Sequence, residues 1–325
     1  MKKWKIWIAI LCIVAFVVAL GVGCNGDDVG ESAKPAGDLE YTLLDGGKSY
    51  AVSGIGDFED KMLVIPEEHE GLPVTKIAKS AFLNKTSFTK LVVSKNVEEI
   101  GEYAFQSCTA LKEVELKKSV EIIGESAFRY CKGLESISLP ESLKTIKTNA
   151  FYECTSLKEV VIPDSVKQIE TTAFHSCKGL TSLTIGSGIT VIEEGTFAQC
   201  RSLATLTIGK NVKNIKKDAF TSCNGLVTVV IPDSVQIIGD HAFHSCEKIE
   251  TLVIGSGVQK IYSVAFYCKS LKNVYYKGTA DAWGAITFQG THAHLKAADL
   301  YYYSETQPTQ SGNFWRYENG EISVW

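Results

Sequence analysis

The stretch AFYECTSLKEVVIPDSVKQIETTAFHSC, residues 150–177, begins with Ala-Phe and a cysteine three positions later, and it ends with the same arrangement. The interval is 23 residues, and it recurs along the chain. Phenylalanine takes this place in nine units, at positions 82, 105, 128, 151, 174, 197, 220, 243 and 266, and isoleucine stands five residues before each of them. This regularity predicts a repeat architecture rather than the two domains that a length of 325 residues would suggest.

Each unit contains one short segment in which apolar residues are spaced by two. In the quoted stretch these are Val160 and Ile162, which would point to one face of a strand, and Pro163 then ends the strand. A unit of 23 residues cannot bury its own apolar side, so neighbouring units must stack. The sequence therefore predicts a solenoid of about nine 23-residue units, with short parallel strands on one face and ladders of Phe, Ile and Cys inside.

The repeated unit reads AFxxCxxLxxVxIPxSVxxI, and this consensus closely resembles the bacterial cell-surface leucine-rich repeat family of BspA type. The resemblance runs from about Tyr41 to Trp325, because YTLLDGGKSYAVSGI and GNFWRYENGEISVW also look like that family's flanks. It implies a curved leucine-rich repeat solenoid at the cell surface, in a family with members linked to adhesion, and it assigns no catalytic residue. One departure is that Cys268 follows Phe266 by two residues rather than three, which leaves the register of the last coil open.

The N-terminus predicts export from the cytoplasm. A basic start is followed by an apolar run over residues 6–23, and small residues precede Cys24, as in bacterial lipoprotein signals. We expect residues 1–23 to be a signal peptide and residues 24–38 to be a polar linker that is lipid-anchored through Cys24. Gly21 stands where such signals favour leucine, so an uncleaved membrane span and plain secretion stay open as alternatives.

The rest of the chain divides into two caps and a repeat region. Asp45-Gly46-Gly47 predicts a hairpin within an N-terminal cap over residues 39–73, and the solenoid is expected over residues 74–276. Residues 277–325 gather many aromatic residues, including Trp283 and Trp315. Their rings suit a C-terminal cap over the apolar end, and a platform that stacks on sugars is the alternative.

The cysteines and histidines of the repeats are not expected to form a reactive or metal centre. Side chains in register lie about 4.8 Å apart, beyond the spacing of a relaxed disulfide, so the eight repeat cysteines are predicted to be free, buried and inert. A linear ladder does not gather four zinc ligands, and His292 with His294 is only a weak metal-binding pair.

Composition and motifs exclude further classes of function. The net charge is −4, with 33 basic and 37 acidic residues, and this balance indicates no nucleic-acid binding. Neither a Gly-x-Ser-x-Gly elbow nor a phosphate-binding Gly-x-x-x-x-Gly-Lys loop is present in the sequence. We therefore expect no enzyme activity, no cofactor and no metal site.

Recognition of a partner is expected on the outward strand positions, eight and ten residues after each phenylalanine. These positions are Glu113, Glu115, Ser136, Ser138, Glu159, Val161, Ser182, Thr184, Thr205, Thr207, Thr228, Val230, Thr251 and Val253. Thr and Val suit any pleated surface, but a regular face without catalytic chemistry favours macromolecular binding.

The sequence therefore predicts an extracytoplasmic surface protein, tethered to the membrane by a lipid anchor, that binds a protein or glycan at a host or bacterial surface for adhesion or capture. The alternatives are a glycan-binding lipoprotein that uses the aromatic C-terminal segment and a purely structural envelope protein. The oligomeric state is left open.

Overall fold

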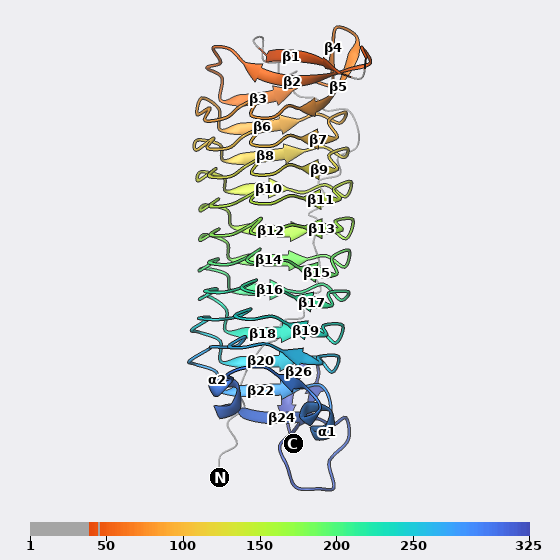
Figure 1. Ribbon diagram of the computed structural model, residues 1–325, viewed down its shortest axis with the longest axis vertical. Helices are drawn as coiled ribbons and strands as arrows, with labels where there is room; N and C mark the ends of the chain where they lie inside the picture. The colour runs from red at the N-terminus through yellow and green to blue at the C-terminus, as the bar shows by residue number, and fades with distance from the viewer. Residues whose placement is uncertain (1–38, 45) are drawn as a thin grey trace.

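The structure is a computed structural model that describes residues 39–44 and 46–325. The chain forms one long stack of coils, with the N-terminal and C-terminal parts of the described chain at opposite ends (Figure 1). Each repeat coil carries an outer strand of three or four residues and a second strand, which has only two residues except at Leu72–Ile77 in the first coil. The solenoid predicted from the 23-residue period is confirmed.

The outer strands pair in parallel with the coil before and the coil after. Residues 23 apart are direct neighbours, so that Val160 lies beside Leu183 and Ile162 beside Ile185. Alternate side chains of these strands point inward, and all four of these are buried. The outer strands of the repeats are β3 (Met62–Ile65), β6 (Lys90–Val93), β8 (Glu113–Leu116), β10 (Ser136–Ser138), β12 (Glu159–Ile162), β14 (Ser182–Ile185), β16 (Thr205–Thr207), β18 (Thr228–Ile231), β20 (Thr251–Ile254) and β22 (Asn273–Tyr276).

A second ladder of short strands runs along the stack, and the sequence did not predict it. It forms at the repeated isoleucine, where Ile100 pairs with Ile123 and Ile123 pairs with Ile146. The isoleucine side chain is buried, and its extended backbone bonds to the next coil. The strands are β5 (Leu72–Ile77), β7 (Glu99–Ile100), β9 (Ile122–Ile123), β11 (Thr145–Ile146), β13 (Gln168–Ile169), β15 (Val191–Ile192), β17 (Asn214–Ile215), β19 (Ile237–Ile238), β21 (Lys260–Ile261) and β23 (Thr287–Phe288).

Both ladders are interrupted. The outer strands fall into three sheets, with breaks between β10 and β12 and between β16 and β18. The short strands break once, between β13 and β15. The breaks in the two ladders lie at different coils, so at least one ladder joins every pair of neighbouring repeat coils among the described residues.

The core is a column of stacked side chains. The nine repeated phenylalanines stack ring on ring from Phe82 to Phe266, with centroids 4.9 to 5.5 Å apart and interplanar angles of 3° to 15°. Burial of one such side chain contributes about 1.5–3 kcal/mol. The eight repeat cysteines are also buried and free, which confirms the prediction for them. The ladders of Phe, Ile and Cys therefore form the interior, as expected.

The turns on either side of each repeated phenylalanine use left-handed backbone, except the turn after Phe266. In the quoted unit, Thr172 has φ 55° two residues before Phe174, and Ser176 has φ 59° two residues after it. Non-glycine residues adopt this region rarely, so the stacking of the coils enforces it. At the last repeat the position two residues before phenylalanine holds Val264, at φ 46°.

The N-terminal cap is a hairpin, as the Gly-rich turn predicted. Strand β1 (Leu39–Leu44) pairs antiparallel with β2 (Ser49–Ile55), and β2 pairs in parallel with β5. Asp45, which was expected in the turn, lies outside the described residues. The extra residues of the first turn form β4 (Glu68–His69), which pairs with the start of β5.

The C-terminal cap fits the expected boundary at residue 277 only roughly, because the stack continues past it. Helix α1 (Ala280–Gly284), β23, helix α2 (Ala293–Ala297) and β24 (Asp299–Tyr303) make one further coil, in which β24 pairs in parallel with β22. The described residues therefore stack eleven outer strands, where about nine units were expected. Strands β25 (Phe314–Glu318) and β26 (Glu321–Val324) then form an antiparallel hairpin.

The short last repeat keeps its place in the stack. Thr251 on β20 pairs with Asn273 on β22, and Phe266 remains stacked on Phe243. The Cys268 thiol lies 3.3 Å from the carbonyl oxygen of Phe243, like its counterparts in other coils. The missing residue is absorbed in the turn, and this answers the question of register that the sequence left open.

Candidate functional site

The outward side chains of the outer strands form a continuous surface, called here the strand face. It consists of the fourteen positions from Glu113 to Val253 that the sequence singled out, two from each of the seven strands β8 to β20. Parallel pairing places equivalent positions directly beside each other, as with Glu113 and Ser136, or Ser182 and Thr205. The twelve positions from Glu113 to Val230 are exposed or half-buried, and they span five strand steps, about 24 Å.

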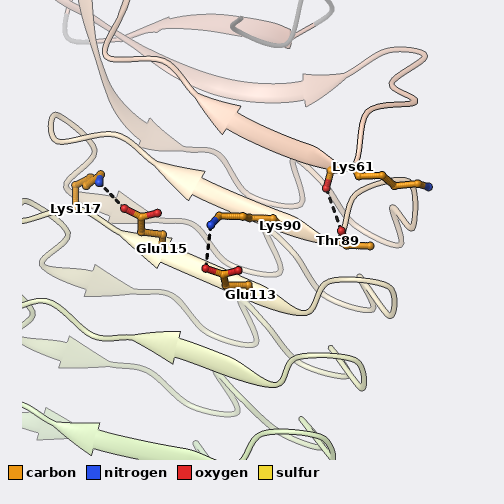
Figure 2. A network of polar contacts seen from close by, with 6 residues as sticks. All are labelled: Lys61, Thr89, Lys90, Glu113, Glu115 and Lys117. Atoms are coloured by element: carbon orange, nitrogen blue, oxygen red, sulfur yellow. Dashed lines mark hydrogen bonds and ion pairs between the residues drawn. The ribbon is translucent and has the colours of Figure 1, made fainter. Parts of the chain in front are cut away.

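The strand face is charged at its N-terminal end. Figure 2 shows Lys90 of β6 reaching Glu113 of β8, with Nζ 2.9 Å from the carboxylate, and Lys117 hydrogen-bonded to Glu115. The hydrogen bond to Glu113 raises the pKa of Lys90. The same view shows the Thr89 hydroxyl near the backbone oxygen of Lys61, at 3.3 Å. Both carboxylates are thus neutralised by lysines of the same surface, and this end offers paired rather than free charge.

The middle of the strand face is small, polar and largely uncharged. Ser136, Ser138, Thr205 and Thr207 are exposed, and Val161 is 52% exposed. Ser182 and Thr184 are half-buried, Glu159 is exposed, and Thr228 and Val230 are half-buried. Hydroxyl groups both donate and accept hydrogen bonds, so this region can pair with polar groups of either kind.

The C-terminal end of the strand face is covered, which corrects the expectation for Thr251 and Val253. Thr251 is 2% exposed and Val253 is fully buried. The β25–β26 hairpin folds back over β20 and β22 in Figure 1, and Trp315 of β25 forms a buried cluster with Val253 and Tyr275. The indole nitrogen of Trp315 donates to the carbonyl oxygen of Tyr276 at 3.0 Å. These two positions are therefore part of an interior contact and are not open to a partner.

The aromatic C-terminal segment is mostly packed against the stack. Trp315 is fully buried, and Trp283 is half-buried against Tyr276 and Phe288, at centroid distances of 5.1 and 5.5 Å. A sugar stacks on an exposed ring face, and Trp315 has none to offer. Trp325, 40% exposed, is the most accessible tryptophan that the structure describes.

The histidines and cysteines singled out from the sequence are packed into the stack. His292 is buried and bonds the backbone oxygen of Gln289 at 2.9 Å, while His294 packs edge-on against Tyr267. No group of three or more His, Cys, Asp or Glu side chains in the described residues is placed to hold a metal ion. Burial raises the pKa of the Cys200 thiol to about 12, and the other repeat cysteines shift in the same direction for the same reason. Such thiols are poor nucleophiles.

The features expected at the N-terminus lie outside the described residues. These are the signal peptide over residues 1–23 and the lipidated Cys24 with its linker over residues 24–38. Within the described part of the chain, no helix is long and apolar enough to cross a membrane.

One feature of the surface was missed by the sequence reasoning. A cavity of about 260 Å³ opens beside the carboxyl ends of the short strands β5, β7, β9 and β11, away from the fourteen positions of the strand face. Gly101 and Gly124, which are 23 residues apart, line it. The sequence signal that could have indicated this cavity is glycine at the same repeat position in two successive units.

The chain is similar to known repeat proteins in sequence and in fold. Residues 75–204 and 190–301 match the family described as BspA type leucine rich repeat region, in six copies. Among curated proteins, none matches the chain.

Solved structures of leucine-rich repeat proteins from several bacteria are similar to this chain. A leucine-rich repeat protein from Bacteroides ovatus is 25% identical, with a TM-score of 0.68 over 82% of this chain and 70% of that chain. The leucine-rich repeat protein of T. pallidum is 31% identical, with a TM-score of 0.55 over 59% of this chain and 89% of that chain. A leucine-rich cell surface protein from Faecalibacterium prausnitzii is 22% identical, with a TM-score of 0.32 over 77% of this chain and 96% of that chain.

Proposed function

The chain belongs to the BspA-type leucine-rich repeat family, and from this premise we propose that it is an extracytoplasmic surface protein that binds a macromolecular partner through the strand face. The partner is a protein or glycan at a host or bacterial surface, and the role is adhesion or capture. The observation that carries the proposal is the open row of outer strands from β8 to β18, which presents exposed hydroxyl, charged and apolar groups in register.

The hairpin that covers the C-terminal end of the strand face supports partner binding by the rest of that face. The β25–β26 hairpin binds the strand face through one aromatic anchor, Trp315, packed on Val253, with a polar contact from its indole nitrogen to Tyr276. Aromatic anchors surrounded by polar contacts are also typical of interfaces between proteins. The same surface, five strand steps long where it is uncovered, has the geometry to accept a partner that lies along the stack.

The proposal includes attachment to a membrane through a lipid on Cys24. The basic start, the apolar run over residues 6–23 and the small residues before the cysteine support it. A lipid anchor with a polar linker would hold the stack close to the membrane surface, in reach of partners on neighbouring cells.

Binding assays on residues 39–325 test the function. The protein is passed over immobilised matrix proteins, mucin and bacterial envelope fractions, and retention on at least one of them is expected. The variant Thr205→Arg places a long cation in the middle of the strand face and should weaken retention by about tenfold or more.

The control is Thr171→Arg, which places the same side chain at an exposed position just past a short strand. Retention of Thr171→Arg like the wild type, with loss in Thr205→Arg, supports the strand face as the binding site. Equal retention of both variants would assign binding to another surface, and no retention on any of these materials would contradict adhesion.

A further inference from the structure

We propose that the cavity beside the short strands β5 to β11 is a binding site for one neutral sugar unit. It lies outside the strand face, so this site is separate from the proposed function. Its lining comes from four consecutive coils and is almost entirely charged: Lys76, Lys79, Glu99, Gly101, Glu102, Gly124, Glu125 and Lys147.

Two neighbouring coils carry glycine at the same place in the cavity lining, where a Cβ would lie within 3.0 Å of the backbone of the coil before. Gly101 and Gly124 directly follow the short strands β7 and β9. In the next four units the same position carries long side chains, namely Lys147, Glu170, Glu193 and Lys216. Stacking brings the two glycines side by side in the lining of this notch, and Lys147 of the following coil lines its end.

Two ion pairs form the walls of the notch. Lys76 lies 2.9 Å from the Glu99 carboxylate, and Lys79 lies 2.8 Å from that of Glu102. Each pair joins residues 23 apart, so each spans neighbouring coils and holds its charges in place.

Two further charges, Glu125 and Lys147, form no ion pair with any residue that the structure describes. Their side chains also form no hydrogen bond in the described chain. A carboxylate that accepts and an ammonium that donates are thus left for a ligand.

The balance of charges selects the ligand. The three ammonium groups would repel a metal cation, and the three carboxylates would repel phosphate or another anion. An apolar ligand would leave these charges desolvated without partners. The hydroxyl groups of a neutral sugar donate to carboxylates and accept from ammonium groups, and such charge-assisted hydrogen bonds are the strong ones. A volume of about 260 Å³ is near the lower limit for ligand pockets, which suits one sugar unit.

Saturation-transfer NMR on the full chain tests the site, with glucose, galactose, mannose, N-acetylglucosamine and N-acetylgalactosamine as probes. At least one of these sugars should receive saturation. The variants Glu125→Gln and Lys147→Met should each weaken its binding by about tenfold, because each removes one charge-assisted hydrogen bond.

Matched controls come from the repeat itself. Glu194→Gln and Lys216→Met change residues 69 positions further on, at the same places in the unit but beside Glu193 instead of a glycine notch. They should leave sugar binding unchanged, and so should Thr205→Arg on the strand face. Thermal melting of each variant confirms that the stack stays folded.

Three results would overturn the site. They are the absence of saturation transfer to all five sugars, equal affinity of the cavity variants and the controls, and binding of inorganic phosphate or Ca²⁺ in place of sugar. None of these results bears on retention through the strand face, which is measured with macromolecular partners, so the two proposals fail independently.

Discussion

The thiol of Cys154 lies 3.2 Å from the carbonyl oxygen of Phe128, which belongs to the coil before it. All eight repeat cysteines make this contact, seven of them with the phenylalanine 26 residues earlier and Cys268 with the one 25 residues earlier. The thiol is a weak donor, but it is buried and satisfies a carbonyl in the turn. Cysteine therefore serves here as a small apolar side chain that also links coils.

Replacing one of these cysteines should loosen the stack measurably. Cys154→Ala removes the thiol and its contact with Phe128, and we expect it to lower the free energy of unfolding by about 1–2 kcal/mol. Urea denaturation followed by circular dichroism measures this. Ser156→Ala, at a half-buried neighbour, is the control and should change stability by less than about 0.5 kcal/mol. A Cys154 variant as stable as this control would show that the contact contributes nothing.

Stability should fall in alkaline solution because of the same cysteines. The ordinary thiol pKa is 9.0, and burial raises the pKa of Cys108, Cys200 and Cys268 to about 12. Between these values the unfolded chain loses protons that the folded chain keeps, so stability is complete below pH 9 and is lost as the pH rises toward 12. Each such thiol lowers the free energy of unfolding by about 1.4 kcal/mol per pH unit in this window. Denaturation midpoints at pH 8 and pH 10.5 measure the effect, and equal midpoints would contradict it.

The buried thiols should also resist modification in the folded protein. At pH 8 a thiol with a pKa of about 12 is ionised to about one part in ten thousand. A thiol reagent should therefore leave all eight repeat cysteines unreacted until denaturant is added, and then label all of them. Peptide mass spectrometry reads this out, and rapid labelling of any repeat cysteine in the native protein would contradict the stack.

Trp315 should hold the C-terminal hairpin on the stack. We expect Trp315→Ala to lower the free energy of unfolding by about 3–5 kcal/mol, because the ring is fully buried against Val253 and Tyr275. Hydrogen exchange at Thr251 and Val253 should rise in this variant, while Val324→Ala, at a 49% exposed position of the same hairpin, should leave it unchanged. Normal stability with loss of sugar binding would instead support the aromatic platform.

Val264 offers a stabilising change. It adopts φ 46°, and a β-branched residue in left-handed backbone is strained. Asparagine tolerates this region, so Val264→Asn should raise the free energy of unfolding by about 1 kcal/mol. Val227→Asn is the control, because Val227 is an exposed valine that is not among the residues with positive φ. A destabilised Val264→Asn protein would mean that the packing of the valine outweighs its backbone strain.

The repeat made much of the fold predictable. The stacking of Phe151 on Phe174, the burial of Cys154 and Cys177, and the parallel pairing of Val160 with Leu183 all follow from the 23-residue period. Equivalent residues in a stack have the same surroundings. An apolar residue that recurs at one position in nine units therefore indicates that this position is buried in every coil.

Other features depend on contacts that the period does not contain. The burial of Val253 comes from Trp315, more than 60 residues further along the chain. The left-handed backbone at Ser176 leaves no mark in the sequence, because stacking rather than the residue type imposes it.

By itself, the sequence determined that this protein is a stack of coils with Phe, Ile and Cys in its interior, because a short repeated unit can bury its apolar residues only against copies of itself. Only the tertiary structure decided which part of the surface stays open. The hairpin closes one end of the strand face, and the lining of the cavity is assembled from coils that lie side by side only in the folded stack. Both outcomes depend on the distance between side chains in space, and a linear pattern of residue types does not specify that distance.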